Sequence, residues 1–263
     1  MGMTAFLERK KREIDGHLII TNNGYTKWFK QGYANTNDVI DLVEQFSVFS
    51  NHFLIAQCMR MVNASTEEAM EAARDILANE IGVGIDIKSG STEGKVFSHK
   101  KAHIKWLRDI GEMLGIDRCK LGRWDIATPA TRQFLEELEE VYGSANGNVG
   151  AGASFAIEYW AGFGLGGSEE EKNNNFWMEL IHGLESYNKY YRTSLNYPAL
   201  NLNFFIFHSS LEEAHVANVE HELEEEFSNS DFDEADWFFG ARKALDAIEI
   251  FWKGLNKTRM TLF

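Results

Sequence analysis

Residues 204–225 read FFIFHSSLEEAHVANVEHELEE, and this stretch decides how the rest of the chain is interpreted. His208, Glu212 and His215 are spaced four and three residues apart, so on a helix their side chains share one face. The phenylalanines and the leucine that follow the same spacing lie on about the same side, which we expect to face the core. Ionisable groups are costly to bury unless they are paired or bind a metal ion. The stretch therefore predicts a helix that carries one wall of a transition-metal site.

The rest of the chain also favours helices, because it has long periodic segments and only two prolines, Pro129 and Pro198. Its 263 residues have a hydrophobic content of 44%, which is ample for a packed core, and they contain no linker and no internal repeat. We therefore expect residues 1–263 to form a single all-α domain of about 7–9 helices. The expected helices are 4–14, 37–63, 66–82, 97–115, 129–143, 149–164, 170–193, 199–227 and 232–256.

Local signals mark where some helices begin and where the helical pattern fails. Ser65 with Glu68 forms a capping-box pattern before the third helix, and Thr128 is an N-cap followed by Pro129 at the first helical position. The segment GVGIDIKSGSTEGKV, at about residues 82–96, is irregular. This insert can form a short hairpin, a lid over a site or a surface loop.

Composition excludes several classes of partner. The net charge of −14 argues against a nucleic acid, because phosphate binding needs clustered lysine and arginine. No apolar run is long enough to span a bilayer, so no membrane partner is expected. The N-terminus MGMTAFLERKKREID lacks the apolar region of a signal peptide, and the two cysteines, Cys58 and Cys119, fit no paired pattern. These features favour a reduced, cytoplasmic compartment.

Three further residues place an ionisable group on the apolar face of a predicted helix. Glu80 lies among apolar side chains near the end of its helix, although an acid at a helix end can also lie near the surface. His103 lies on a buried stripe, with His99 as a rival one turn earlier. Glu158 lies in ASFAIEYWAGFG, which is apolar on nearly every side and contains no lysine or arginine. A lone core histidine is usually only hydrogen-bonded, so a single residue of this kind does not indicate a metal site. Several of them together do.

The candidate metal ligands are thus three carboxylates and three histidines on four helices, namely Glu80, His103, Glu158, His208, Glu212 and His215. A mixed nitrogen and oxygen set of this kind suits iron or manganese, and it lacks the thiolates of a structural zinc site. Helical bundles build two-iron sites from carboxylates and histidines that project inward.

A ferritin-like di-iron site is one alternative, because that pattern needs two Glu-x-x-His pairs. The chain contains two such pairs, Glu212 with His215 and Glu179 with His182. His182 lies about 160° from the centre of the apolar stripe of its helix, so we expect it to be exposed. The ferritin-like order, with a ligand Glu on a helix before each pair, is also absent. The ferritin-like interpretation is therefore the weaker one.

The full set resembles that of the haem-oxygenase-like di-iron oxidases, the group related to the chlamydial CADD protein. That family uses a Glu followed by a His, a Glu on another helix, and then His-x-x-x-(Asp/Glu)-x-x-His. The last motif is similar to His208-Ser-Ser-Leu-Glu212-Glu-Ala-His215. The segment ILANEIG contains Glu80, FAIEYWA contains Glu158, and AHIKWLRDIGEMLG resembles the family's His helix, which puts His103 rather than His99 at the ligand position. The resemblance covers about residues 45–225.

The resemblance implies a TenA/CADD-like helical bundle and an O2-dependent non-haem iron oxidoreductase. It implies two Fe(II) ions per chain held by the six residues named above, O2 as co-substrate, and Glu80, Glu158 and Glu212 in the catalytic centre. The family acts on amino acids, their derivatives and fatty acids, through C–H abstraction, C–C cleavage or N-oxygenation. The expected partner is a small-molecule substrate, and an external electron donor and a homodimer are compatible with the sequence.

The chain departs from the family pattern in three ways. The segments between Glu80 and His103 and between Glu158 and His208 are unusually long, and position 212 is Glu where Asp is more usual. The extra methylene of Glu212 alters how this carboxylate can bridge two metal ions. A metal-free, TenA-like small-molecule-binding protein on the same scaffold is the alternative from another functional class, because fold alone does not determine function.

Overall fold

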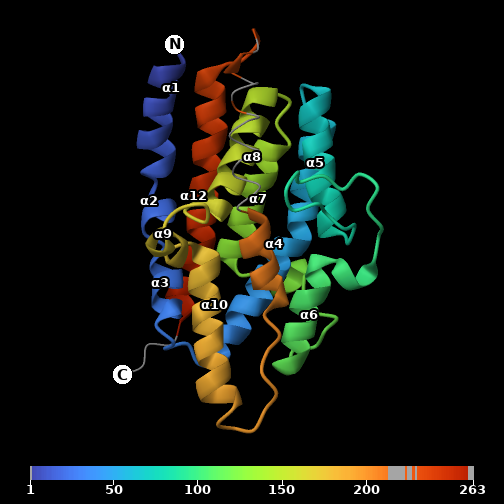
Figure 1. The fold of residues 1–263 in the computed structure, drawn as a ribbon, viewed down its shortest axis with the longest axis vertical. Helices are drawn as coiled ribbons and strands as arrows, with labels where there is room; N and C mark the ends of the chain where they lie inside the picture. Colours follow the sequence, from blue (N-terminus) through green and yellow to red (C-terminus); the bar gives the residue numbers. More distant parts are fainter. Residues whose placement is uncertain (1, 213–222, 224–226, 229, 260–263) are drawn as a thin grey trace.

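The computed structural model describes residues 2–212, 223, 227, 228 and 230–259, and the secondary structure of these residues is helical apart from one isolated β-bridge (Figure 1). The all-α prediction is therefore confirmed. The α-helices with named bounds are α1 (Met3–Lys10), α2 (Leu18–Thr21), α3 (Gly24–Lys30), α4 (Thr36–Val62), α5 (Glu67–Glu80), α6 (His103–Met113), α7 (Pro129–Tyr142), α8 (Gly147–Gly162), α9 (Glu169–Asn173), α10 (Phe176–Tyr187) and α12 (Glu234–Thr258). Residues 203–212 are also helical. Among the described helices, none is both long and apolar enough to cross a bilayer.

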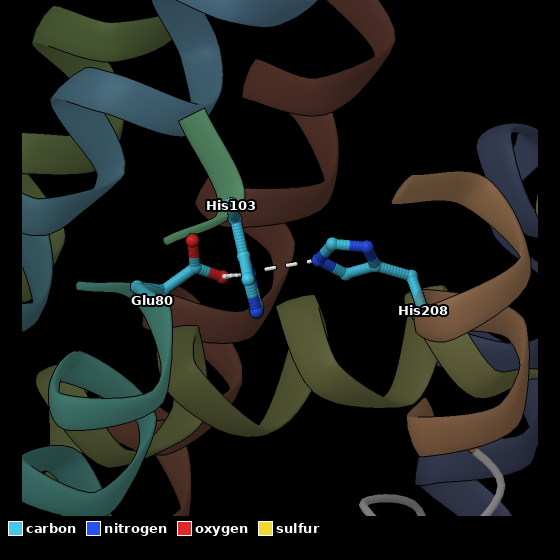
Figure 2. A group of neighbouring side chains, drawn as sticks. All are labelled: Glu80, His103 and His208. Atoms are coloured by element: carbon cyan, nitrogen blue, oxygen red, sulfur yellow. Dashed lines mark ion pairs between the residues drawn. The ribbon is translucent and has the colours of Figure 1, made fainter. Parts of the chain in front are cut away.

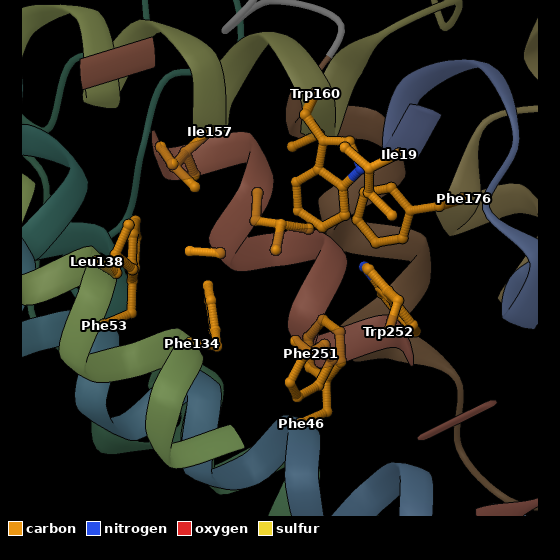
Figure 3. Packing of buried hydrophobic residues seen from close by; sticks show 14 of the residues in the cluster. Ile19, Phe46, Phe53, Phe134, Leu138, Ile157, Trp160, Phe176, Phe251 and Trp252 are labelled. Carbon is orange, nitrogen blue, oxygen red and sulfur yellow. The ribbon is translucent and has the colours of Figure 1, made fainter. Parts of the chain in front are cut away.

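The centre of the bundle is built on α8, which is buried on nearly every side and packs along α12 and α7 (Figure 1). The contact with α12 is close because glycines face the opposite backbone. A Cβ on Gly152 would collide with the Trp237 carbonyl oxygen, and a Cβ on Gly240 would collide with the Val149 carbonyl oxygen. Aromatic side chains fill much of the remaining core, among them Phe46, Phe134, Trp160, Phe251 and Trp252 (Figure 3).

The insert between α5 and α6 closes on itself and brings the ends of these two helices together. The Ser98 N–H donates to the Gly82 carbonyl oxygen at 2.8 Å, and Val83 and Phe97 form the isolated antiparallel bridge. Gly82 has a φ of +112°, a conformation that favours glycine. The insert is thus a hairpin with one bridge. It places Glu80, the last residue of α5, next to His103, the first residue of α6.

Most predicted helices agree with the structure to within a few residues, but three regions differ. The expected helix 170–193 is divided into α9 and α10, because the Asn175 side chain accepts from the Trp177 N–H and begins a new helix. The short helices α2 and α3 were not expected, because four and seven residues are too few to show a periodic pattern. The expected helix 97–115 is interrupted at Ala102, whose ψ is 128°, because the bridge at Phe97 holds the chain extended just before it.

The helix-capping predictions had mixed outcomes. Thr128 caps α7 as predicted, since its side chain accepts from the Thr131 N–H with Pro129 at the first helical position. The Ser65 capping box is wrong. Thr66 caps α5 instead, accepting from the Ala69 N–H at 3.1 Å, because α5 begins one residue later than expected.

Candidate metal centre

Glu80, His103 and His208 meet at one point inside the bundle (Figure 2). The Glu80 Oε1 atom lies 2.9 Å from His103 Nδ1 and 4.0 Å from His208 Nε2. One ligand atom from each residue lies within 4.8 Å of the other two. Two imidazoles and one carboxylate are the donor set of many non-haem Fe(II) sites.

The helix of residues 203–212 orients His208. Its Nδ1 atom lies 2.6 Å from the Phe204 carbonyl oxygen, one turn earlier on the same helix. A carbonyl oxygen can only accept, so this bond requires the proton on Nδ1. The lone pair of His208 is then on Nε2, the atom that faces Glu80 and His103, as is usual for a metal-binding histidine.

His103 is buried, but its ring nitrogens lack hydrogen-bond partners. Its side chain is 1% exposed, and neither ring nitrogen has a hydrogen-bond partner of acceptable geometry. Glu80 Oε1 is close to Nδ1, but it lies outside the direction in which a ring N–H would point. A buried imidazole without a hydrogen bond is rare in proteins. The close approach of His103 Nδ1 and Glu80 Oε1 without a hydrogen bond is what we expect of two atoms that bind the same cation.

The protonation states suit cation binding. Burial lowers the pKa of His103, and the nearby Glu80 only partly opposes this effect, so the imidazole favours its neutral form. Burial alone would raise the pKa of Glu80, but positive charge on His103 and His208 and hydrogen bonds from these rings lower it to about 2. A bound cation would supply that positive charge when the imidazoles are neutral. A neutral imidazole and an ionised carboxylate are the forms that bind metals.

A cavity of about 70 Å³ lies beside these residues. Its polar lining consists of Glu80, Glu158, His208 and Glu212 together with Ser50 and Asn79. The other residues that line the cavity are apolar. Six of them are aromatic, namely Phe46, Phe49, Phe53, Trp160, Trp177 and Phe204. Within the described part of the chain, no residue of the 82–96 insert lines the cavity, so the structure gives no support to the lid interpretation.

The other predicted ligands divide into two groups. Glu158 and Glu212 line the same cavity and are 5% and 6% exposed, but they lie outside the tight group of three. Glu212 is near enough for its charge to raise the pKa of His103. His215 lies outside the described residues. The structure therefore brings four of the six side chains, Glu80, Glu158, His208 and Glu212, to one cavity, with His103 in contact with Glu80 beside it. The role of these residues as ligands stays a prediction.

Sequence reasoning missed the tryptophans that pack on the two histidines. Trp106 stacks on His103 with ring centroids 5.3 Å apart, and Trp177 stacks on His208 at 4.8 Å. The spacing of three residues between His103 and Trp106 could have indicated the first contact. Trp177 is on a different helix, so no local signal pointed to the second. Both rings hold an imidazole plane in place.

The residues that the sequence offered as alternative metal ligands, His99, Glu179 and His182, lie outside the candidate site. His99 is exposed and packs against Phe97, so it does not compete with His103. Glu179 is buried, but it accepts a hydrogen bond from the Thr26 hydroxyl at 2.6 Å and does not line the cavity. His182 is half-buried rather than exposed as expected, because the predicted stripe of α10 was narrower than the buried face.

A second group with metal-ligand spacing, His17, Asp246 and Glu249, is explained without a metal. The His17 Nδ1 atom accepts from the Ile19 N–H at 3.3 Å and caps α2. With the lone pair on Nδ1, a neutral ring carries its proton on Nε2, which faces Asp246 at 3.2 Å. Nε2 is then a donor rather than a metal ligand.

Comparison with known proteins identifies the fold. No family model and no curated protein matches the sequence. The chain is similar in structure to a domain of unknown function with a heme oxygenase-like fold from Shewanella denitrificans OS217, with a TM-score of 0.62 and 15% identity over 98% of this chain and 93% of that one. It is also similar to a TenA homolog from Pseudomonas syringae pv. tomato DC3000, with a TM-score of 0.65 and 8% identity over 96% and 93% of the two chains. The chain has a haem-oxygenase-like, all-α fold.

Proposed function

We propose that the chain is a non-haem di-iron oxidase that uses O2 to oxidise a small molecule. The observation that carries the proposal is the state of His103, which is buried without a hydrogen bond and faces Glu80 and His208 across distances that one metal ion can span. Glu80, His103 and His208 would hold one ion. Glu158, Glu212 and the predicted ligand His215 would hold the second.

The chain's own residues have separate tasks in this proposal. Two ferrous ions, when bound, supply electrons for the reduction of O2. The Phe204 carbonyl holds the proton of His208 on Nδ1 and so keeps Nε2 ready to bind. The aromatic walls exclude water and accept an apolar part of the substrate. An external electron donor would restore the reduced state for another turnover.

A metal-free, TenA-like binding protein is the second candidate, and two observations favour it. A TenA homolog has a similar fold. The 2.9 Å contact between Glu80 and His103 is also what an ion pair without metal looks like. In that case the cavity binds a small molecule, and Glu80 acts as a polar contact.

Oxygen uptake separates these functions. After anaerobic loading with Fe(II) and removal of excess metal, the protein should consume O2 and show a transient change in visible absorption. The variant His208→Ala should do neither, because its site lacks one ligand. The matched control Glu140→Gln removes an exposed acid and should behave like wild type. Equal O2 uptake by wild type and His208→Ala would contradict the oxidase proposal and favour the binding protein.

A further inference from the structure

Residues 95–108, KVFSHKKAHIKWLR, bear a positive charge that the proposed metal centre does not use. This segment contains four lysines, one arginine and no acid, whereas the rest of the chain has 21 lysines and arginines against 40 acids. Its basic residues are Lys95, Lys100, Lys101, Lys105 and Arg108. A positive region on an otherwise acidic protein directs a negatively charged partner to one face of the molecule.

Two lysines of this segment are available to a partner. Lys95 and Lys105 each form an ion pair with an acid of the chain, at 3.6 and 2.6 Å. Lys100 and Lys101 are exposed, and neither pairs with a carboxylate in the described part of the chain. Arg108 donates to the Leu121 carbonyl oxygen, so no acid neutralises its charge there. The positive charge is therefore strongest around Lys100 and Lys101.

Trp106 lies beside these lysines and is half-buried. Its indole N–H donates to the Lys100 carbonyl oxygen at 2.8 Å. Val96 and Phe97, near the start of the same segment, are 78% and 47% exposed. Exposed apolar side chains next to charged ones are typical of surfaces that bind another protein. We call Val96, Phe97, Lys100, Lys101 and Trp106 the Trp106 surface.

The inner side of Trp106 contacts the candidate metal centre. Its ring stacks on His103, with the ring centroids 5.3 Å apart and an angle of 19° between the planes. His103 is 1% exposed, and its Nδ1 atom lies 2.9 Å from the Glu80 carboxylate. The half-buried indole therefore joins the molecular surface to a predicted metal ligand with no residue between them.

An electron-carrier protein is the class of partner that fits both sides of Trp106. A carrier protein is too large to enter the bundle, so its electron must pass through the protein to the metal centre. A conjugated ring in contact with a metal ligand provides such a path. The positive surface selects an acidic carrier. Encounters between redox proteins use small interfaces, so a surface of a few side chains is enough for one.

We propose that the Trp106 surface docks a small acidic one-electron carrier protein, and that Trp106 conducts the electron to the metal centre at His103. The inference rests on the proposed function, since it names the electron donor of the same site. Each transfer oxidises the carrier by one electron and reduces one ferric ion to ferrous. A turnover that leaves two ferric ions therefore takes two reduced carriers. Docking itself does not require iron.

The docking test uses metal-free protein and a plant-type ferredoxin, a small acidic iron–sulfur protein, with binding measured by calorimetry at low ionic strength. Two acidic proteins repel each other unless a local surface attracts. Wild type should bind, and the double variant Lys100→Glu with Lys101→Glu should bind about tenfold more weakly. Added salt should weaken binding by wild type, because it screens exposed charges.

The matched control is the double variant Lys11→Glu with Lys257→Glu, which has the same net charge. Both lysines are exposed. Lys11 directly follows α1, and Lys257 lies in the last turn of α12. These parts of the two helices lie on the opposite side of the bundle from α6 (Figure 1). The control should bind ferredoxin as wild type does, apart from the small effect of net charge.

The electron-transfer test mixes the protein loaded with ferric iron and reduced ferredoxin without O2, and follows the oxidation of ferredoxin by its visible absorption. Trp106→Phe should dock ferredoxin equally well but oxidise it at least about tenfold more slowly, because phenylalanine is a poorer path for an electron. A purely structural role of Trp106 would lower the iron content and leave the rate per bound iron unchanged. Trp124→Phe, at another half-buried tryptophan, is the control.

Three outcomes overturn the inference: ferredoxin does not bind wild type, the two double variants bind it equally well, or Trp106→Phe with full iron content oxidises it at the wild-type rate. Tighter binding of a short DNA duplex than of ferredoxin would also contradict it, because the surface would then select phosphate. Iron uptake and O2 consumption without docking would reject this inference alone. The absence of iron uptake by wild type would instead reject the proposed function.

Discussion

At the scale of single residues, the proposed function depends on how the hydrogen bonds of His103 and His208 are satisfied. His103 lacks a hydrogen bond on both ring nitrogens, although it is buried and near Glu80. His208 is the opposite case, because the Phe204 carbonyl fixes which nitrogen carries its proton. Each brings one ring nitrogen to within 4.8 Å of the other and of a Glu80 carboxylate oxygen. This pairing of one oriented and one unsatisfied imidazole favours a metal site over two core histidines.

Glu158 provides a prediction at this scale. It lies at the same cavity but apart from the group of Glu80, His103 and His208, so it should serve the second ion only. In Glu158→Gln we expect iron content after anaerobic loading to fall from about two ions per chain to about one. Metal analysis checks this result. Retention of both ions would show that Glu158 is not a ligand.

At the scale of secondary-structure elements, helix ends and close crossings position the site. Glu80 ends α5 and His103 begins α6, and the bridged insert holds these two ends together. Glu158 is presented by α8, whose place is set by its glycine-mediated contact with α12. Small changes at these contacts should therefore alter stability more than surface changes do.

The variant Gly152→Ala tests the α8–α12 contact. Its Cβ would collide with the Trp237 carbonyl oxygen, so the helices must separate. Overpacking of this kind lowers the free energy of unfolding by about 1–3 kcal/mol. Urea denaturation measures the loss. Gly166→Ala is the control, because no atom lies within 4 Å of a Cβ there. Equal stability of the two variants would mean that the crossing tolerates a methyl group.

At the scale of the whole molecule, ion pairs join the N-terminal segment to the last helix. Glu13 contacts Arg9 and Arg12 in its own segment and Arg242 of α12, while Arg9 also bonds Glu234 at 2.9 Å. Burial alone would raise the pKa of Glu13, but hydrogen bonds from the three arginines lower it to about 2. A lowered carboxyl pKa stabilises the fold at pH values above the unfolded value of 4.5.

The stabilisation by Glu13 should disappear as the pH falls from 4.5 toward 2, because the carboxylate then takes up a proton. At pH 7, Glu13→Gln should lower the free energy of unfolding by about 1–2 kcal/mol. The difference from wild type should narrow below pH 4.5, as measured by urea denaturation across this range. Glu8→Gln, at an exposed position on α1, is the control. A difference that does not change with pH would rule out this ion-pair network as its source.

The sequence predicted the parts that depend on helical periodicity. The spacing of apolar residues was enough to place Glu80, Glu158 and His208 on buried faces. It left His99 as a rival to His103, and the resemblance to the family's His helix was needed to prefer His103. Periodicity could not reveal that both ring nitrogens of His103 lack a hydrogen bond, because that depends on which groups of other helices surround the ring. It also missed α2 and α3, which are held by caps at His17 and Asn23 and by packing rather than by periodicity.

The central claim is that Glu80, His103 and His208 form part of a two-iron site. The most direct test is the iron content of the protein after anaerobic Fe(II) loading and removal of unbound metal. The account predicts about two ions per chain in wild type and His182→Ala, and a loss of at least one in His103→Ala. No uptake by wild type, or equal uptake by wild type and His103→Ala, would contradict it.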